Sequence, residues 1–310
     1  MLSQTAALVR RRSADNPLRA YAVDRVYMTG YSQTAGYART YAIAIAPFAR
    51  RPGGGPICDG YLAGGQAPFN VVITTCTPMF KPDDPRLAVA NVGGPYVDVA
   101  GEGDTQLTYL MRRPDGDTAP DLFRRYEIAG ATHSGATVTP YTPRQADLDR
   151  SHSYDTSTVG CLPSGPPLSA FPMPDAMQAM WVNLDRWVTR QVAPPHGTPI
   201  SLQDGPGHRI AIKDRFGNAP GGVRTTAVDV PIATWHSSRG GKPSCMRVGY
   251  ASPFDAARLE SLYPTKAGYV AKVIARAPTS EARQANCRFT GSIDRGGARV
   301  DTMNDRRRQA

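Results

Sequence analysis

The side chains of this sequence whose types could do chemistry together are a serine, a histidine and two neighbouring carboxylates: Ser32, His133, Glu102 and Asp104. A serine hydroxyl is a poor nucleophile until an imidazole accepts its proton. The imidazole in turn needs a carboxylate that fixes its tautomer and stabilises its protonated form. These residue types therefore indicate acyl transfer through a covalent serine intermediate, if the fold brings them together.

Ser32 lies in the stretch DRVYMTGYSQTAGYARTY, residues 24 to 41, where a hydrophobic run meets small residues. We expect a strand at residues 25–29 and a helix from about Gln33. The sharp turn between them would hold the serine hydroxyl at the top of a sheet, as a nucleophile elbow does.

The small residues of an elbow let the strand and the helix pass without Cβ clashes, which is why its usual pattern is G-x-S-x-G. Gly30 fits this pattern and Thr34 does not, although Ala35 and Gly36 follow at once. The same letters also fit an ordinary Gly-Tyr-Ser turn between a strand and a helix.

The acidic pair and the histidine each follow a predicted strand. GPYVDVAGEGD, residues 94 to 104, runs into an acidic loop, and LFRRYEIAGATHS, residues 122 to 134, runs into a loop with His133. We favour Asp104 as the carboxylate that serves the histidine, because a loop could bend back there, and we keep Glu102 as the alternative acid. A solvated turn aspartate and a hydrogen-bonded loop histidine are the simpler interpretations.

The elements that must position these residues read as strands alternating with helices. NVVITTCT, residues 70 to 77, is a β-branched run typical of a buried parallel strand. Helices are expected at 5–21, after Ser32 and at 105–112. This alternation predicts a doubly wound, mostly parallel α/β sheet, in which the carboxyl ends of the strands meet at one edge. The chain order nucleophile, acid, histidine is that of α/β-hydrolases.

The rest of the chain reads as a lid-like insertion, an amphipathic helix and a helical C-terminal region. Pro, Ser, Thr and Gly fill residues 135–174, which suits a loop over a pocket or a plain surface excursion. Apolar residues at helical spacing follow, from Met177 to Val188. Short strands and turns are expected at 208–240, and two helical pieces at 254–262 and 267–275.

We expect one partial core domain at residues 1–195, an accessory region of the same domain at 196–287, and a disordered tail at 288–310.

Composition excludes several classes of function. No run of eighteen apolar residues exists, so no membrane span is expected, and the N-terminus lacks the apolar core of a signal peptide. The net charge is +10, but the arginines are scattered, which argues against nucleic-acid binding. Five cysteines without a C-x-x-C spacing argue against a zinc site. They suit buried thiols, or one or two disulfides in an exported protein. No cofactor is expected.

Several segments together carry a resemblance to a known family: GYSQTAGYARTY, YEIAGATHS, LDRWVTRQVAPP and GNAPGGVRTTAVDVPIATW. They resemble the bacterial alpha/beta hydrolase domain proteins, which have a G-x-S-Q-[ST]-G-like elbow. The resemblance covers most of residues 15–275. It implies a serine-hydrolase fold with Ser32 as nucleophile, Asp104 or Glu102 as acid and His133 as base.

Two departures from the family accompany the resemblance. Ala35 replaces a glycine of the elbow, and only 31 residues precede Ser32, where family members carry the first strands of the sheet and a loop that supplies an oxyanion donor. The backbone N–H of Gln33 is then the visible oxyanion donor, and losing its companion would cost about 3 kcal/mol in the transition state.

We therefore expect the N-terminal strands of the sheet to be missing. The strand edge left unpaired would favour self-association. Export is expected only if a missing upstream segment carries a signal. The expected function is a carboxylic-ester hydrolase that acts on a small-molecule ester. The alternative is an inactive fragment or a non-catalytic binding protein of the same fold.

Overall fold

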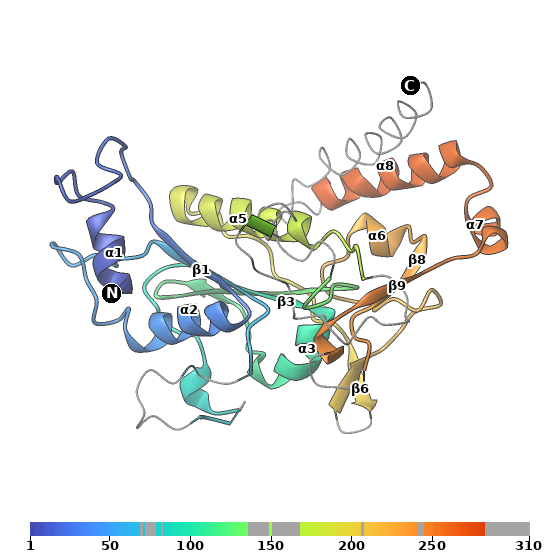
Figure 1. The fold of residues 1–310 in the computed structure, drawn as a ribbon, viewed down its shortest axis with the longest axis horizontal. Coiled ribbons are helices and arrows are strands. Elements are labelled where there is room, and N and C mark those ends of the chain that lie inside the picture. The colour runs from blue at the N-terminus through green and yellow to red at the C-terminus, as the bar shows by residue number, and fades with distance from the viewer. Residues whose placement is uncertain are drawn as a thin grey trace.

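The computed structural model (Figure 1) describes residues 1–68, 71, 79–81, 83–135, 149–150, 168–205, 208–240 and 245–282, with side chains through residue 276. Some expectations lie outside these residues: most of the strand at 70–77, most of the lid-like insertion at 135–174, and the tail at 288–310.

The centre of the described chain is a five-stranded sheet in the order β1-β2-β3-β5-β4. Four of these strands run parallel, and β4 pairs antiparallel with β5 at one edge of the sheet. β1 forms the other edge. The strands are β1 (Tyr27–Tyr31), β2 (Gly60–Gly64), β3 (Tyr96–Gly101), β4 (Gly116–Thr118) and β5 (Asp121–Ile128).

Helices cover both faces of this sheet (Figure 1). Tyr61 and Ala63 of β2 belong to a buried cluster with α1 (Leu2–Leu8) and α2 (Gln33–Ala44). Leu62, which lies between them in the sequence, belongs to the opposite cluster with α5 (Met173–Arg190). Successive side chains of a strand point to opposite faces, so each strand feeds both cores. The expected doubly wound, mostly parallel sheet and the amphipathic helix around Met177 are confirmed.

Two strands differ from the expectation. β1 begins and ends two residues later than the expected strand at 25–29. At its end the ladder continues to the elbow, where the N–H of Ser32 donates to the carbonyl of Gly64 over 2.8 Å. β2 was not expected at all. Its sequence GYLAG has a glycine at each end, and glycine weakens the signal of a strand.

The expected helix at residues 5–21 is wrong beyond its first turns, since α1 ends at Leu8. Asn16 explains the break. Its side-chain amide donates to the carbonyl of Val9 over 3.1 Å and its side-chain oxygen accepts the N–H of Leu18 over 2.8 Å. A side chain that bonds the nearby backbone in this way competes with helix formation, and a proline follows it in the sequence.

The C-terminal region consists of short elements, as expected, and two helices. Backbone hydrogen bonds tie it to the end of β5, where Ser134 accepts from Gly249 over 3.1 Å and donates to Arg247 over 2.8 Å. The elements are β6 (Leu202–Gly205), β7 (His208–Ala211), α6 (Thr226–Asp229), β8 (Ala233–His236), β9 (Tyr250–Pro253), α7 (Ala256–Leu262) and α8 (Lys266–Ala282). The remaining elements are α3 (Glu102–Thr108) and the 3-10 turns η1 (Pro85–Leu87), η2 (Tyr109–Met111) and η3 (Cys245–Arg247).

None of the described helices has the length and apolar character needed to cross a membrane. Cys58 is a buried free thiol, whereas Cys245 is disulfide-bonded.

Candidate active site

Ser32 occupies a strained turn between β1 and α2. Its backbone angles are φ 56° and ψ −124°, a conformation that non-glycine residues rarely adopt and that is found where structure is held for function. The strand and the helix pass so closely that a Cβ atom at Gly30 would lie 2.3 Å from the carbonyl carbon of Thr34. Glycine is therefore required at this position, and the turn leaves Ser32 partly exposed.

His133 lies five residues beyond the end of β5 and bonds two of the predicted residues at once. Its Nε2 is 2.9 Å from the Oγ of Ser32, and its Nδ1 is 2.6 Å from an Oδ of Asp104. An ionised carboxylate can only accept a hydrogen bond, so Nδ1 carries the proton of the neutral ring. Nε2 is then the acceptor for the serine hydroxyl.

Asp104 lies in the first turn of α3, not in a loop as expected. The helix begins at Glu102, directly after β3, with Gly101 as its N-terminal cap. One carboxylate oxygen of Asp104 bonds His133 and the other accepts the N–H of Gly101 over 2.9 Å. The cap thus satisfies a helix N–H and fixes the rotamer of the carboxylate in the same contact.

Glu102, the alternative acid, is fully buried and turned to other partners. Its carboxylate accepts the N–H of Gly130 over 3.0 Å and the hydroxyl of Ser237 over 3.2 Å, and it forms an ion pair with Lys213. Within the described chain, Asp104 is the carboxylate at hydrogen-bond distance from His133. Glu102 instead joins α3 to the histidine loop and to the C-terminal region.

Tyr31, which sequence reasoning did not single out, contacts His133. The ring centroids are 5.4 Å apart at an interplanar angle of 35°, and the phenol hydroxyl donates to the backbone carbonyl of His133 over 2.9 Å. Burial, and secondarily the charge of Asp104, raises the pKa of this phenol well above its usual value. Its position directly before Ser32 in the sequence was the signal that could have marked Tyr31 as part of the site.

Gln33, the expected oxyanion donor, is the first residue of α2. Backbone N–H groups in the first turn of a helix have no acceptor within the helix, and the helix dipole adds partial positive charge there. The N–H of Gln33, one residue after Ser32 in the sequence, therefore lies at the positive end of α2. Among the described strands, none pairs with the outer side of β1, where a second donor would be expected.

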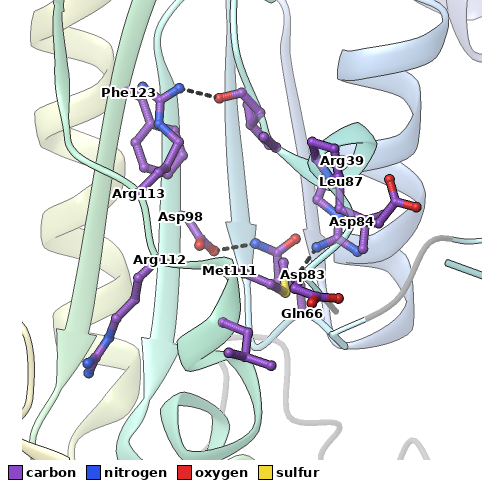
Figure 2. Close-up of a pocket in the computed structure, with 14 residues that line it drawn as sticks. Arg39, Gln66, Asp83, Asp84, Leu87, Asp98, Met111, Arg112, Arg113 and Phe123 are labelled. Atoms are coloured by element: carbon purple, nitrogen blue, oxygen red, sulfur yellow. Dashed lines mark hydrogen bonds between the residues drawn. The ribbon is translucent and has the colours of Figure 1, made fainter. Parts of the chain in front are cut away.

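A pocket of about 100 Å³ lies on the α2 side of the sheet (Figure 2). It is lined by Arg39, Gln66 and Asp98, with the amide of Gln66 donating to Asp98 over 2.6 Å. Neither Ser32 nor His133 contributes to its wall. No group of three or more potential metal ligands occurs among the described residues.

A family model described as an alpha/beta hydrolase domain matches residues 1–285. No curated protein and no solved structure matches the chain. The family match covers most of the chain, including the elbow, both carboxylates and the histidine, so the chain belongs to the alpha/beta hydrolase domain family.

Proposed function

We propose that this member of the alpha/beta hydrolase domain family is a serine hydrolase that cleaves carboxylic esters through an acyl-serine intermediate. The observation that carries the proposal is the continuous hydrogen-bonded path from Ser32 through His133 to Asp104, with distances of 2.9 and 2.6 Å. Such a path is the arrangement that activates a serine hydroxyl.

The first half-reaction forms the acyl-serine. The Oγ of Ser32 attacks the ester carbonyl while Nε2 of His133 takes its proton, and Asp104 stabilises the resulting imidazolium. The N–H of Gln33 donates to the carbonyl oxygen as negative charge develops on it. The tetrahedral intermediate then collapses, the carbon–oxygen bond to the alcohol breaks, and the imidazolium returns its proton to the leaving alkoxide.

The second half-reaction frees the serine. A water molecule gives a proton to Nε2 of His133 and attacks the acyl carbon, so that the bond between the acyl group and Ser32 breaks. The imidazolium then protonates the Oγ of Ser32. A carboxylic acid leaves, and the enzyme returns to its starting state.

A second candidate function is a non-catalytic binding protein of the same fold. The observation that favours it is the position of β1 at the edge of the described sheet, where no neighbouring strand end supplies a second oxyanion donor. Loss of one donor costs about 3 kcal/mol in the transition state, roughly a hundredfold in rate.

A fluorophosphonate probe and p-nitrophenyl butyrate separate the two candidates. We expect the probe to label the native chain, Ser32→Ala to abolish labelling and turnover, and Ser252→Ala to retain both. Ser252 is the matched control because its Oγ lies 3.1 Å from Nε2 of His236, and no carboxylate of the described chain forms a hydrogen bond with that imidazole. Equal turnover in native protein and Ser32→Ala would remove Ser32 from the mechanism, and a native chain with neither labelling nor turnover would favour the binding protein.

A further inference from the structure

We propose that Tyr31 is a positioning residue for His133: its ring supports one side of the imidazole, and its hydroxyl holds the backbone of the same residue. The inference rests on the proposed function, because it assigns a partner to the base of that reaction. It adds a fourth side chain to the path from Ser32 to Asp104.

Within the described chain, three side chains hold the ring of His133: Ser32, Asp104 and Tyr31. Two hydrogen bonds, to Ser32 and to Asp104, fix the edges of the imidazole. They permit rocking of the ring about the line between them. The Tyr31 ring, 5.4 Å away at 35°, lies against the imidazole and opposes that motion.

The hydroxyl of Tyr31 adds a hold on the main chain. It donates to the carbonyl of His133 over 2.9 Å, so one side chain contacts both the ring and the backbone of the histidine. The raised pKa of the phenol keeps this donor protonated throughout the neutral range. A ring that is held at two points is misplaced less often, and small misplacements of a catalytic group cost large factors in rate.

Tyr31 is itself fixed by the elbow. The hydroxyl of Thr34 accepts its N–H over 2.9 Å and donates to its carbonyl over 2.7 Å. Thr34 departs from the G-x-S-x-G pattern, and these two bonds explain the departure. The threonine fixes the backbone of Tyr31, the residue that supports His133.

A glycine pair at the end of β2 makes room for the Tyr31 ring. A Cβ atom at Gly64 would lie 2.9 Å from one ring carbon of Tyr31, and one at Gly65 would lie 3.0 Å from another. The Cβ at Gly65 would also lie 3.2 Å from Nδ1 of His133. Both rings therefore share a space that only glycine leaves open.

The electrostatics favour the same geometry. The face of an aromatic ring attracts a cation, and His133 becomes a cation only after it has taken the proton of Ser32. The Tyr31 ring therefore interacts more strongly with the transition state than with the resting enzyme, which lowers the barrier and leaves substrate binding unchanged.

The test uses Tyr31→Leu, Tyr31→Phe and a matched control on the same strand and face, Tyr27→Leu. The Tyr27 ring packs on Trp181 at 6.0 Å and its hydroxyl bonds Asp185, so it offers the same two kinds of contact away from His133. We expect Tyr31→Leu to lower kcat at least about tenfold with KM within about twofold. Tyr31→Phe should keep the ring support and lose about fivefold in kcat, and Tyr27→Leu should stay within about twofold of the native kcat.

A second measurement does not depend on ester turnover. The proton between Nδ1 of His133 and Asp104 gives a downfield proton NMR signal when the ring is held. We expect the signal to be lost in Tyr31→Leu and retained in Tyr31→Phe and in Tyr27→Leu. If the native chain proves inactive but the signal follows this pattern, the proposed function fails and the positioning role of Tyr31 stands.

Two results would overturn the inference. One is a folded Tyr31→Leu with native kcat and an intact signal. The other applies if Tyr31→Leu does not fold: native kcat in Tyr31→Phe would then show that the hydroxyl contact has no effect on the histidine.

Discussion

Glu102 and Asp104 show how two carboxylates two residues apart take different tasks from the same helix start. Asp104, at the third position of α3, turns back over the N-terminal cap and reaches His133. Glu102, at the first position, points to Gly130 and Lys213. In the proposed reaction Asp104, which bonds the imidazole, acts on catalysis directly, whereas Glu102 acts on how α3 is held.

We expect Asp104→Asn to lower kcat by about four orders of magnitude with little loss of stability, because the amide favours the wrong tautomer of His133. Glu102→Gln should lower kcat far less and should reduce the free energy of unfolding by about 1 to 3 kcal/mol, because the hydrogen bonds to Ser237 and Lys213 weaken. Esterase kinetics and urea unfolding of both variants check this. The reverse ranking in kcat would give the catalytic role to Glu102.

At the scale of elements, β3 and β5 are joined by a buried cluster of charges as well as by their ladder. Asp98 and Arg125 lie opposite each other in the register and form an ion pair of 2.5 Å. Arg125 also bonds Glu127, which accepts a second ion pair from Arg112 over 2.7 Å. The cluster therefore extends from β3 through β5 to the turn after α3, and it stiffens the sheet beneath the site.

Glu127→Gln tests this cluster. We expect a loss of about 3 to 5 kcal/mol in the free energy of unfolding at pH 7, because removing one partner leaves Arg125 in a buried site with less compensation. Asp204→Asn is the control, because the Asp204 carboxylate also pairs with an arginine, Arg209, but is 91% exposed. Urea unfolding should show little change for that variant.

The same variant should also change the pH dependence of stability. Burial alone would raise the pKa of Glu127, but the hydrogen bonds and charges of Arg112 and Arg125 outweigh burial and lower it below the value of the unfolded chain. The stability that this carboxylate supplies is therefore present above about pH 4.5 and is lost as the pH falls through the lower folded value. The difference between native protein and Glu127→Gln should narrow in acid. A difference that stays constant from pH 6 to pH 3 would contradict this.

The sequence predicted the elements whose signals are local. The run before Ser32, the β5 strand and the apolar spacing of α5 each carry their own pattern, and the structure has all three. The acidic stretch with Glu102 and Asp104 was expected to be a loop. The structure has a helix there instead, and the Asp104 carboxylate caps it by accepting the N–H of Gly101. The contact between Tyr31 and His133 depends on the space above Gly64 and Gly65, which no pattern within one segment reveals.

At the scale of the whole molecule, the outer side of β1 is the sheet edge nearest the site. Val26 and Ser32 bond toward β2, through Asp59 and Gly64 respectively. Because residues of a parallel strand alternate in the side to which their backbone bonds, Tyr27, Thr29 and Tyr31 direct their N–H and C=O groups outward. An edge of this kind is a template for pairing with another chain.

We expect the chain to self-associate through this edge and Thr29→Lys to reduce the association, because a lysine on an edge strand discourages pairing. Thr118→Lys, on β4 at the opposite edge, is the matched control for the added charge. Size-exclusion chromatography with light scattering measures the oligomeric state of each. A native chain that is a monomer at high concentration, or an equal effect of both lysines, would contradict a role for β1.

The two hydrogen bonds between Thr34 and Tyr31 set a limit on any such assembly. They occupy the outward N–H and C=O of Tyr31, so within β1 an incoming strand could pair with the outward backbone groups of Tyr27 and Thr29. The added ladder spans about 7 Å at the usual rise per residue and stops before the elbow. Thr34 would therefore stop an added strand before the elbow. Ser32 would stay accessible to substrate when two chains pair edge to edge.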